Sequence, residues 1–434
     1  MSRVVVIGGG FGGTATAARL AKQGHDVTLV ERLHRLGGAV GFVERDGFRW
    51  DAGPSSTALP AVVRDLFRKS GRPLEKELEL VPVEPMREHR FADGTVLAMP
   101  TGSRSAQLDE VEQALGGGLG RRWVDYVHDF ADTWDRLRRA YLERAYSAEH
   151  VDRATRSLLR TRSTLHRAVT RAFRDERLRE LALFQSRLEG HDPRHVPAWM
   201  GMWAYVEQNF GVWTVAGGMG LLADAMTKRL SERKVHVLLG TTAVDLRLEK
   251  GRPVAVETDQ GPVDADVVVC AVDPRGLPTL APHVARTMPA IPPVVCHLGL
   301  VGEVPELPHE VVLHGDPTLV VRTNGVAPDG AAAWTVLARG RLSEDVVVAL
   351  ARLGIDVRDR IEVRVDRSPR DQVEELAGSS YGVLWQGRAT IDRKLASTPY
   401  DGVFAVGAHA AAGAQLPLVG LSAAVVAEQI GPAR

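Results

Sequence analysis

A glycine fingerprint near the first residue constrains the fold of this chain more than any other feature. The sequence opens VVVIGGGFGGTATAARLAKQGHDVTLVER, in which Gly8, Gly10 and Gly13 form the pattern G-x-G-x-x-G. A β-branched run precedes these glycines, an alanine-rich segment follows them, and a second apolar run, residues 27–30, ends at Glu31. This order predicts a strand, a tight turn, a helix and a second strand, which together form a Rossmann-type unit that binds a dinucleotide.

Each part of this unit has a physical role. Gly8 permits the tight turn, Gly10 lets the backbone approach a pyrophosphate, and Gly13 lets the helix pack closely on the strand. The unpaired N–H groups and the positive dipole end of the helix stabilise the phosphates. Glu31 ends the second strand, where its carboxylate is placed to accept hydrogen bonds from the ribose hydroxyls.

The residues after Glu31 indicate which dinucleotide to expect. A short arm, RLHRL, leads to the pair Gly37-Gly38, and the segment DAGPSS follows at residues 51–56. An acid, a short arm and a Gly-Gly pair resemble the opening of the superfamily of FAD-binding amine oxidases and phytoene desaturases. The resemblance implies FAD as the cofactor, with contacts from Arg32, Gly37, Gly38, Pro54 and Ser55.

The resemblance extends over nearly the whole chain. The segments HDPRHVPAWMG, GVWTVAGGMG, GSSYG and VGAHAAAGAQLPLVG are most similar to those of bacterial phytoene (carotenoid) desaturases. It implies that the backbone of Val244 contacts the adenine. It also implies that a strand at residues 403–406 and a helix at about residues 418–430 pass the flavin ring, with contacts from Gly407, Leu416, Pro417 and Leu418. The N-terminus of that helix would stabilise negative charge on reduced flavin.

The sequence departs from the family pattern in three places. Ala39 stands where amine oxidases usually have an arginine, and residues 410–413 read Ala-Ala-Ala-Gly where desaturases usually have Thr-His-Pro-Gly. The chain is also shorter than is usual for carotenoid desaturases. A carotenoid is therefore one of several substrates to consider.

The expected fold class is α/β, with two domains assembled from separated segments. An FAD-binding Rossmann-like domain is expected from residues 1–95, 201–275 and 378–434. A second, α+β domain would cover the flavin and bind the substrate. Its helical insert is expected at residues 96–200, where arginines are frequent, and its antiparallel sheet at residues 276–377, where strand-like runs recur.

The predicted chemistry is carried by the flavin, because the sequence contains no nucleophile–base motif and no metal-ligand spacing. We expect dehydrogenation of a hydrophobic molecule, an isoprenoid, polyene or secondary metabolite, by hydride transfer to flavin N5. His409 and Gln415 are the polar candidates for contact with substrate or ring, beside the alternative that His409 only packs or caps a turn. No catalytic acid or base is predicted, and no metal.

The alternatives share the same dinucleotide motifs. They are amine oxidation at a C–N bond, isomerisation that uses reduced FAD without net electron transfer, and a flavoprotein that serves as a scaffold. A second G-x-G-x-x-G is absent from the sequence, so we expect oxygen, a quinone or another diffusible oxidant to accept the electrons. Four aromatic residues are expected either to line a substrate channel or to belong to the core: Trp199, Trp203, Tyr205 and Trp213.

Charge and cysteine content bear on partners and location. Lysine plus arginine equals aspartate plus glutamate, 54 against 54, so no nucleic-acid partner is expected. Seven arginines and no acid occur between Arg153 and Arg174, and six of them would share one stripe of a continuous helix. That stripe predicts either a solvated face or weak contact with the inner face of an anionic membrane. Cys270 and Cys296 suit buried thiols in a cytoplasmic protein.

Overall fold

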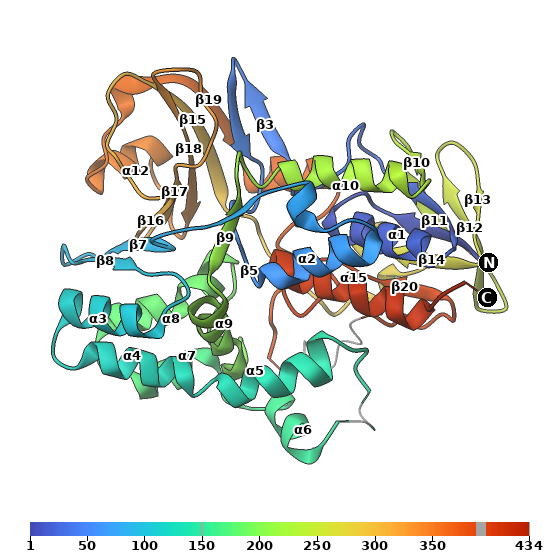
Figure 1. Cartoon of the computed structure of the whole chain (residues 1–434), viewed down its shortest axis with the longest axis horizontal. Coiled ribbons are helices and arrows are strands. Elements are labelled where there is room, and N and C mark those ends of the chain that lie inside the picture. Colours follow the sequence, from blue (N-terminus) through green and yellow to red (C-terminus); the bar gives the residue numbers. More distant parts are fainter. Residues whose placement is uncertain (148, 150, 388–395, 434) are drawn as a thin grey trace.

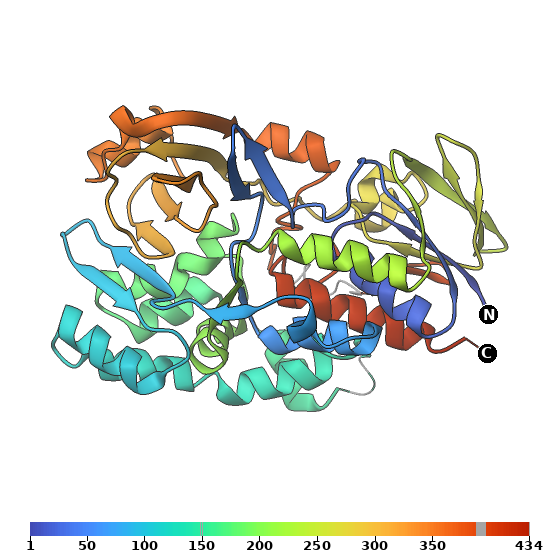
Figure 2. The same cartoon turned by 45° about the horizontal axis from the view of Figure 1, so that its top comes forward.

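In the computed structural model, two large sheets lie at opposite ends of the molecule, and a group of helices lies beside them (Figure 1). The structure describes residues 1–147, 149, 151–387 and 396–433. Residues 388–395, part of the expected third cofactor-binding segment, lie outside this description. The two chain ends lie close together at the five-stranded sheet, where the Ala433 N–H donates to the carbonyl of Gln23 (Figures 1 and 2).

The first sheet is parallel throughout and contains the predicted N-terminal unit. Its strands are, in spatial order, β10 (His236–Leu238), β2 (Asp26–Val30), β1 (Arg3–Ile7), β14 (Val267–Cys270) and β20 (Val403–Ala405). Helix α1 (Phe11–Lys22) connects β1 to β2. Residues 4–7 are buried, as expected for a strand that is covered on both faces.

Different layers cover the two faces of this sheet. One face packs on four helices: α1, α2 (Pro60–Ser70), α10 (Leu221–Glu232) and α15 (Leu416–Ile430). The other face packs on a three-stranded sheet: β11 (Ala243–Glu249), β12 (Arg252–Thr258) and β13 (Val263–Asp264). Segments from both ends of the chain thus build one domain, as predicted.

The second large sheet has seven strands and is antiparallel except where β7 pairs with β16. Its spatial order is β19 (Ile361–Arg367), β15 (Val294–Val301), β18 (Ala331–Arg339), β17 (Thr318–Arg322), β16 (Glu310–Leu313), β7 (Arg87–Arg90) and β8 (Val96–Met99). Helix α12 (Val346–Arg352) covers one face. Helix α8 (Glu176–Leu188) contributes Phe184 and Leu188 to the other.

The remaining elements form the helical part and short connections. The helical part contains α3 (Arg104–Leu115), α4 (Leu119–His128), α5 (Ala131–Leu137), α6 (Arg153–Leu159), α7 (Leu165–Ala172), α8 and α9 (Met202–Phe210). The connections contain β3 (Phe42–Arg45), β4 (Phe48–Asp51), β5 (Thr57–Ala58), β6 (Leu80–Pro82), β9 (Val212–Val215), α11 (Ala281–Val284) and α13 (Pro369–Leu376). Short turns lie at Leu74–Lys76, Arg138–Leu142, Ala198–Gly201, Pro274–Gly276 and Arg358–Arg360.

Two elements join a part of the fold other than the one that their segment predicts. Strand β7 lies in the segment 1–95, yet it pairs with β8 and β16 in the seven-stranded sheet. Helix α9 lies in the segment 201–275, yet it packs on α4 and α5. Strand β7 joins that sheet through β16, and α9 packs on α4 and α5; these partners are far away in sequence, so local patterns carry no sign of the contacts.

The prediction of one continuous arginine-bearing helix between Arg153 and Arg174 is wrong. The chain forms α6, leaves the helical conformation, and begins again as α7. Thr164 causes the restart, because its side chain accepts a hydrogen bond from the N–H of Arg167 and caps α7. The seven arginines are exposed nevertheless: Arg153, Arg156, Arg160, Arg162, Arg167, Arg171 and Arg174.

Neither cysteine forms a disulfide. Cys270 and Cys296 are buried free thiols, and burial raises the pKa of Cys270 to about 12. Among the helices of the described chain, none combines the length and apolar character that are needed to cross a membrane.

Candidate active site

A cavity of about 430 Å³ runs along the carboxyl ends of β1, β2 and β14, the edge of a parallel sheet where ligands usually bind. The predicted cofactor residues that line it are Gly8, Gly10, Glu31, Arg32, Gly37, Gly38, Pro54, Ser55, Gly407, Leu416 and Pro417. The candidates His409 and Gln415 line it as well. The structure thus brings together residues from both ends of the chain.

The glycines of the fingerprint have different surroundings. Gly8 has a φ of +103° and faces Val272, so it makes the turn that a side chain would strain. A Cβ atom on Gly13 would lie 1.9 Å from the carbonyl oxygen of Gly8, whereas one on Gly10 would meet nothing within 4 Å. Gly13 therefore serves the packing of α1 on β1, and Gly10 leaves open space in the cavity wall.

Glu31 is fixed at the end of β2 by the backbone around it. Its Oε2 accepts a hydrogen bond from the N–H of Gly9 at 2.6 Å, and its Oε1 accepts one from the N–H of Leu33 at 2.7 Å. The side chain is 9% exposed. Because each carboxylate oxygen has further acceptor capacity, Glu31 is held in place for additional donors from the cavity side.

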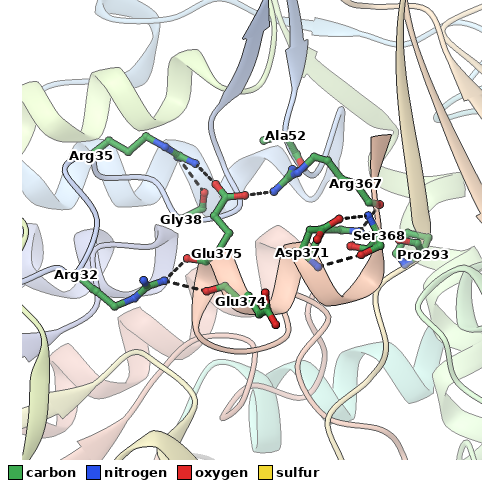
Figure 3. Close-up of polar contacts among 11 residues, drawn as sticks. Arg32, Arg35, Gly38, Ala52, Pro293, Arg367, Ser368, Asp371, Glu374 and Glu375 are labelled. Carbon is green, nitrogen blue, oxygen red and sulfur yellow. Dashed lines mark hydrogen bonds and ion pairs between the residues drawn. The ribbon is translucent and has the colours of Figure 1, made fainter. Parts of the chain in front are cut away.

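The arm that follows Glu31 is attached to the C-terminal end of α13 (Figure 3). Arg32 donates to the backbone carbonyls of Glu374 and Glu375. The carboxylate of Glu375 pairs with both Arg35 and Arg367. These contacts hold α13 and the loop that carries Gly38 together, along the cavity wall that Arg32 and Glu375 line.

The C-terminal turn and α15 form the opposite wall. Helix α15 begins at Leu416, two residues earlier than predicted, and its N-terminus has no side-chain cap. Gln415, Leu416, Pro417 and Val419 line the cavity, so the uncapped first turn lies at its edge. Leu418 points elsewhere, into the hydrophobic core and a separate small cavity.

Three predicted cofactor residues do not line the cavity: Gly13, Leu418 and Val244. The side chain of Val244 is 50% exposed, and the wall is formed instead by the residues just before it, Thr241, Thr242 and Ala243. The pairing of β11 with β12 shifts register between Ala243 and Asp245. The exposed side chain of Val244 does not bear on the predicted contact between its backbone and the adenine, which stays a prediction.

Two polar residues of the cavity wall, Ser55 and His409, differ in their neighbours. The hydroxyl oxygen of Ser55 is buried, and it has no hydrogen-bond partner among residues in the described ranges. The Nδ1 atom of His409 lies 3.8 Å from a carboxylate oxygen of Asp273, and both residues line the cavity. Ser55 is thus a buried polar group with capacity for a ligand.

A charged network that the sequence did not reveal also lines the cavity. Arg87 donates to both carboxylate oxygens of Glu207, at 3.1 and 2.6 Å, and to Glu310 at 2.7 Å. Arg322 donates to the other oxygen of Glu310 at 2.9 Å. Burial opposes ionisation of Glu310, but the two arginines outweigh it and lower the pKa of this carboxyl to about 2.

No local sequence motif predicts this network, because its members are spread between residues 87 and 322. Trp203 and Tyr381 also line the cavity. Trp203 is one of the aromatic residues considered for a channel, and Tyr381 lies in the segment GSSYG that supported the family resemblance. Trp199, by contrast, is 1% exposed and packs in the core.

The residues present fit FAD. The open space at Gly10, the uncapped N-termini of α1 and α15, and the held carboxylate of Glu31 suit a pyrophosphate, a flavin ring and a ribose. The buried hydroxyl of Ser55 adds a polar group that a ligand can satisfy. The departure at Ala39 does not remove positive charge from this region, since Arg32 lines the same cavity.

Comparison with known proteins agrees with this fit. Residues 11–430 match the family described as flavin containing amine oxidoreductase. The 4,4'-diapolycopene oxygenase of Methylomonas sp is 26% identical to this chain, over 99% of it and 98% of that protein. The phytoene dehydrogenase of Streptomyces griseus is 30% identical, over 73% of this chain and 64% of that protein.

Solved structures share the fold at low sequence identity. Cyclohexylamine oxidase from Brevibacterium oxydans superposes with a TM-score of 0.65 and 18% identity, covering 99% of each chain. The family match, the motifs and the geometry of the cavity lead to one assignment. This chain belongs to the flavin containing amine oxidoreductase family and is an FAD-dependent oxidoreductase.

Proposed function

We propose that this enzyme dehydrogenates a largely hydrophobic molecule of isoprenoid or polyene type. The observation that carries the proposal is the continuity of one cavity, which extends from the glycine fingerprint to Trp203, Leu188 and Val212 between the two domains. A substrate held there would lie beside the flavin and out of bulk water. The two relatives described above are named after diapolycopene and phytoene, which favours this substrate class.

Within this proposal, the chain's residues bind and orient. Gly10 and the first turn of α1 hold the pyrophosphate, and Glu31 holds the ribose. The uncapped first turn of α15, where Leu416 and Pro417 line the cavity, would stabilise negative charge on the ring through its unpaired N–H groups. When bound, FAD supplies a two-electron acceptor for hydride at N5, so the protein itself needs no nucleophile.

The domain limits and the electron acceptor are also part of the proposal. Segments near residues 1–82, 212–275 and 396–433 form the cofactor domain, with β7 and α9 assigned to the substrate domain according to their packing. Oxygen, a quinone or another diffusible oxidant would then reoxidise the flavin.

An anaerobic mixing experiment tests the proposed reaction. The visible spectrum of the FAD-loaded protein is recorded before and after addition of a hydrophobic extract of its host or of defined polyenes. Bleaching of the flavin bands, their return with oxygen or quinone, and a product lighter by two hydrogens in mass spectrometry are expected. A product of unchanged mass would indicate isomerisation, release of ammonia would indicate amine oxidation, and no reaction with any polyene would contradict the proposal.

We further propose weak contact with the inner face of an anionic membrane through α6 and α7. Seven exposed arginines support it: six lie in these helices and in the turn between them, and Arg174 follows α7. Sedimentation with vesicles containing phosphatidylglycerol should recover more protein at low salt than at high salt, because charge screening weakens such contacts. Equal recovery with purely zwitterionic vesicles would contradict this proposal.

A further inference from the structure

Two segments that are far apart in the sequence both line the cavity. One is the arm at residues 31–38, and the other is the end of α13 with the turn that follows it, residues 375–381. The arm lies against the glycine fingerprint, because the N–H of Gly37 donates to the carbonyl of Gly9 at 2.8 Å and Gly37 pairs with Gly10 in a parallel β-bridge. The arm therefore borders the open space that Gly10 leaves for the cofactor.

Three arginines and one carboxylate connect the two segments (Figure 3). Arg32 donates to the carbonyls of the last turn of α13, and Glu375 pairs with Arg35 of the arm at 2.8 Å. The second carboxylate oxygen of Glu375 pairs with Arg367 on β19. We call Arg32, Arg35, Arg367 and Glu375 the clamp. It joins the arm to α13 and to an edge strand of the seven-stranded sheet.

The turn after α13 depends on contacts from outside the helix. Ala377 follows the last turn with a φ of +50°, a left-handed conformation that alanine disfavours and that persists where surrounding contacts hold it. The carbonyls at the end of a helix also carry partial negative charge, which a nearby cation stabilises. Arg32 is that cation, since it donates to the carbonyls of Glu374 and Glu375. The clamp thus holds the second wall segment at its first residue.

The charge of Glu375 has the wrong sign for a favourable direct contact with the cofactor. It lies in the wall of a cavity whose residues suit a pyrophosphate, and like charges repel. Its two carboxylate oxygens are instead paired with Arg35 and Arg367. Glu375 can therefore favour retention of FAD only through the arginines that it holds.

We propose that the clamp retains FAD, and that Glu375 is a positioning residue that slows release of the cofactor. With the clamp intact, the arm and the end of α13 keep their separation, and both walls stay against the bound cofactor. Breaking the clamp frees one wall to move away from the other. This inference goes beyond the proposed function, because it concerns exchange of FAD and not the substrate.

The rate of FAD release from the oxidised holoenzyme tests the inference. The protein is diluted into buffer without FAD, and the fluorescence of the freed flavin is followed over time. Glu375→Gln keeps the size of the side chain but removes the charge that pairs with Arg35 and Arg367. We expect release about fivefold faster than from the wild type, as for the loss of partly exposed ion pairs.

The direction of this change is decisive. If Glu375 acted on FAD only through its own negative charge, its removal would slow the release of the anionic cofactor. Unchanged or slower release from Glu375→Gln therefore overturns the inference.

Glu374→Gln is the matched control on the same helix. The carboxylate of Glu374 pairs with Arg370 within α13, and the backbone carbonyl that Arg32 uses is unchanged by the substitution. This variant should release FAD at the rate of the wild type. Equal acceleration in both variants would assign the effect to α13 as a whole and would contradict the clamp.

Salt separates the clamp from a general loosening of the fold. The side chains of Arg35 and Glu375 are 42% and 36% exposed, so salt screens their attraction. Effects of salt on FAD itself are common to both proteins. The ratio of the release rates of Glu375→Gln and wild type should therefore fall toward one as sodium chloride is raised. A ratio that does not change with salt would contradict an effect carried by these ion pairs.

Arg35→Gln breaks one of the two ion pairs from the other side. It should also accelerate release, and the double variant Arg35→Gln/Glu375→Gln should be little faster than Glu375→Gln alone, because both changes act through one contact. Fully additive effects would contradict the clamp. All these measurements follow flavin alone, so their outcome is independent of whether the enzyme dehydrogenates a polyene.

Discussion

At the scale of single residues, Gly10 and Gly13 allow stability and cofactor binding to be separated within one motif. Gly10 has an ordinary φ of −69°, and an alanine there would meet no protein atom within 4 Å. We expect Gly10→Ala to leave the unfolding midpoint unchanged and to weaken FAD binding by about tenfold, or 1.4 kcal/mol, because the methyl group occupies cofactor space. Titration of the apoprotein with FAD measures this.

Gly13→Ala is the matched comparison. Its methyl group would lie 1.9 Å from a backbone oxygen of the same turn, so α1 has to move away from β1. A loss of about 1–3 kcal/mol or more in unfolding free energy is expected, as for overpacked cores. If both variants lost stability equally, the different roles assigned to the two glycines would be incorrect.

Glu31 is a third test at this scale. Glu31→Ala removes the acceptor proposed for the ribose and also frees the N–H groups of Gly9 and Leu33. A charge-assisted hydrogen bond is worth about 1.5–3 kcal/mol, so FAD affinity should fall by at least about tenfold. Fluorescence titration with FAD gives the value, and full flavin occupancy of the variant at low FAD would argue against the ribose assignment.

At the scale of elements, the strand–helix–strand unit could be predicted because all its signals are local. The glycine spacing, the β-branched run and the terminal acid lie within about thirty residues, as the motif requires. The bulge in β11 that sets Val244 between two registers could not be predicted, because it depends on how β11 pairs with β12. A shift of this kind leaves no mark on residue composition.

The break between helices α6 and α7 also could not be predicted from the sequence pattern. The spacing of the arginines favours one continuous helix, but the side chain of Thr164 caps a new helix, so the chain forms two. We expect Thr164→Ala to destabilise the protein by about 0.5–2 kcal/mol through loss of this cap, and Thr164→Ser to restore most of it. Urea unfolding followed by circular dichroism is the measurement. Stabilisation by alanine would instead favour a continuous helix.

At the scale of the whole molecule, charged residues in the cavity connect parts of the chain that no local pattern relates. Arg87 lies on β7, Glu207 on α9, and Glu310 and Arg322 on neighbouring strands. Arg322 also donates to the carbonyl of Gly53 in the segment DAGPSS. The network thus connects the helical part, the seven-stranded sheet and the segment DAGPSS around the cavity. This arrangement exists only after folding, which is why the sequence did not reveal it.

This role predicts a large effect of removing one charge. Glu310→Gln leaves Arg87 and Arg322 without one of their carboxylates in a buried site, where breaking an ion pair typically costs about 3–5 kcal/mol. We expect that loss in unfolding free energy near neutral pH. Glu303→Gln, a change at an exposed acid outside the cavity, serves as the control and should have little effect.

The pH dependence of that loss follows from the direction of the pKa shift. The pKa of Glu310 is lowered from 4.5 to about 2, so its ionised form stabilises the folded state at pH values above about 4.5. As the pH falls from about 4.5 toward 2, this contribution disappears in the wild type, whereas Glu310→Gln lacks it at every pH. The difference between the two proteins should therefore shrink across this window in urea unfolding. If the difference in unfolding free energy stayed constant down to pH 3, the charge of Glu310 would not stabilise the folded protein.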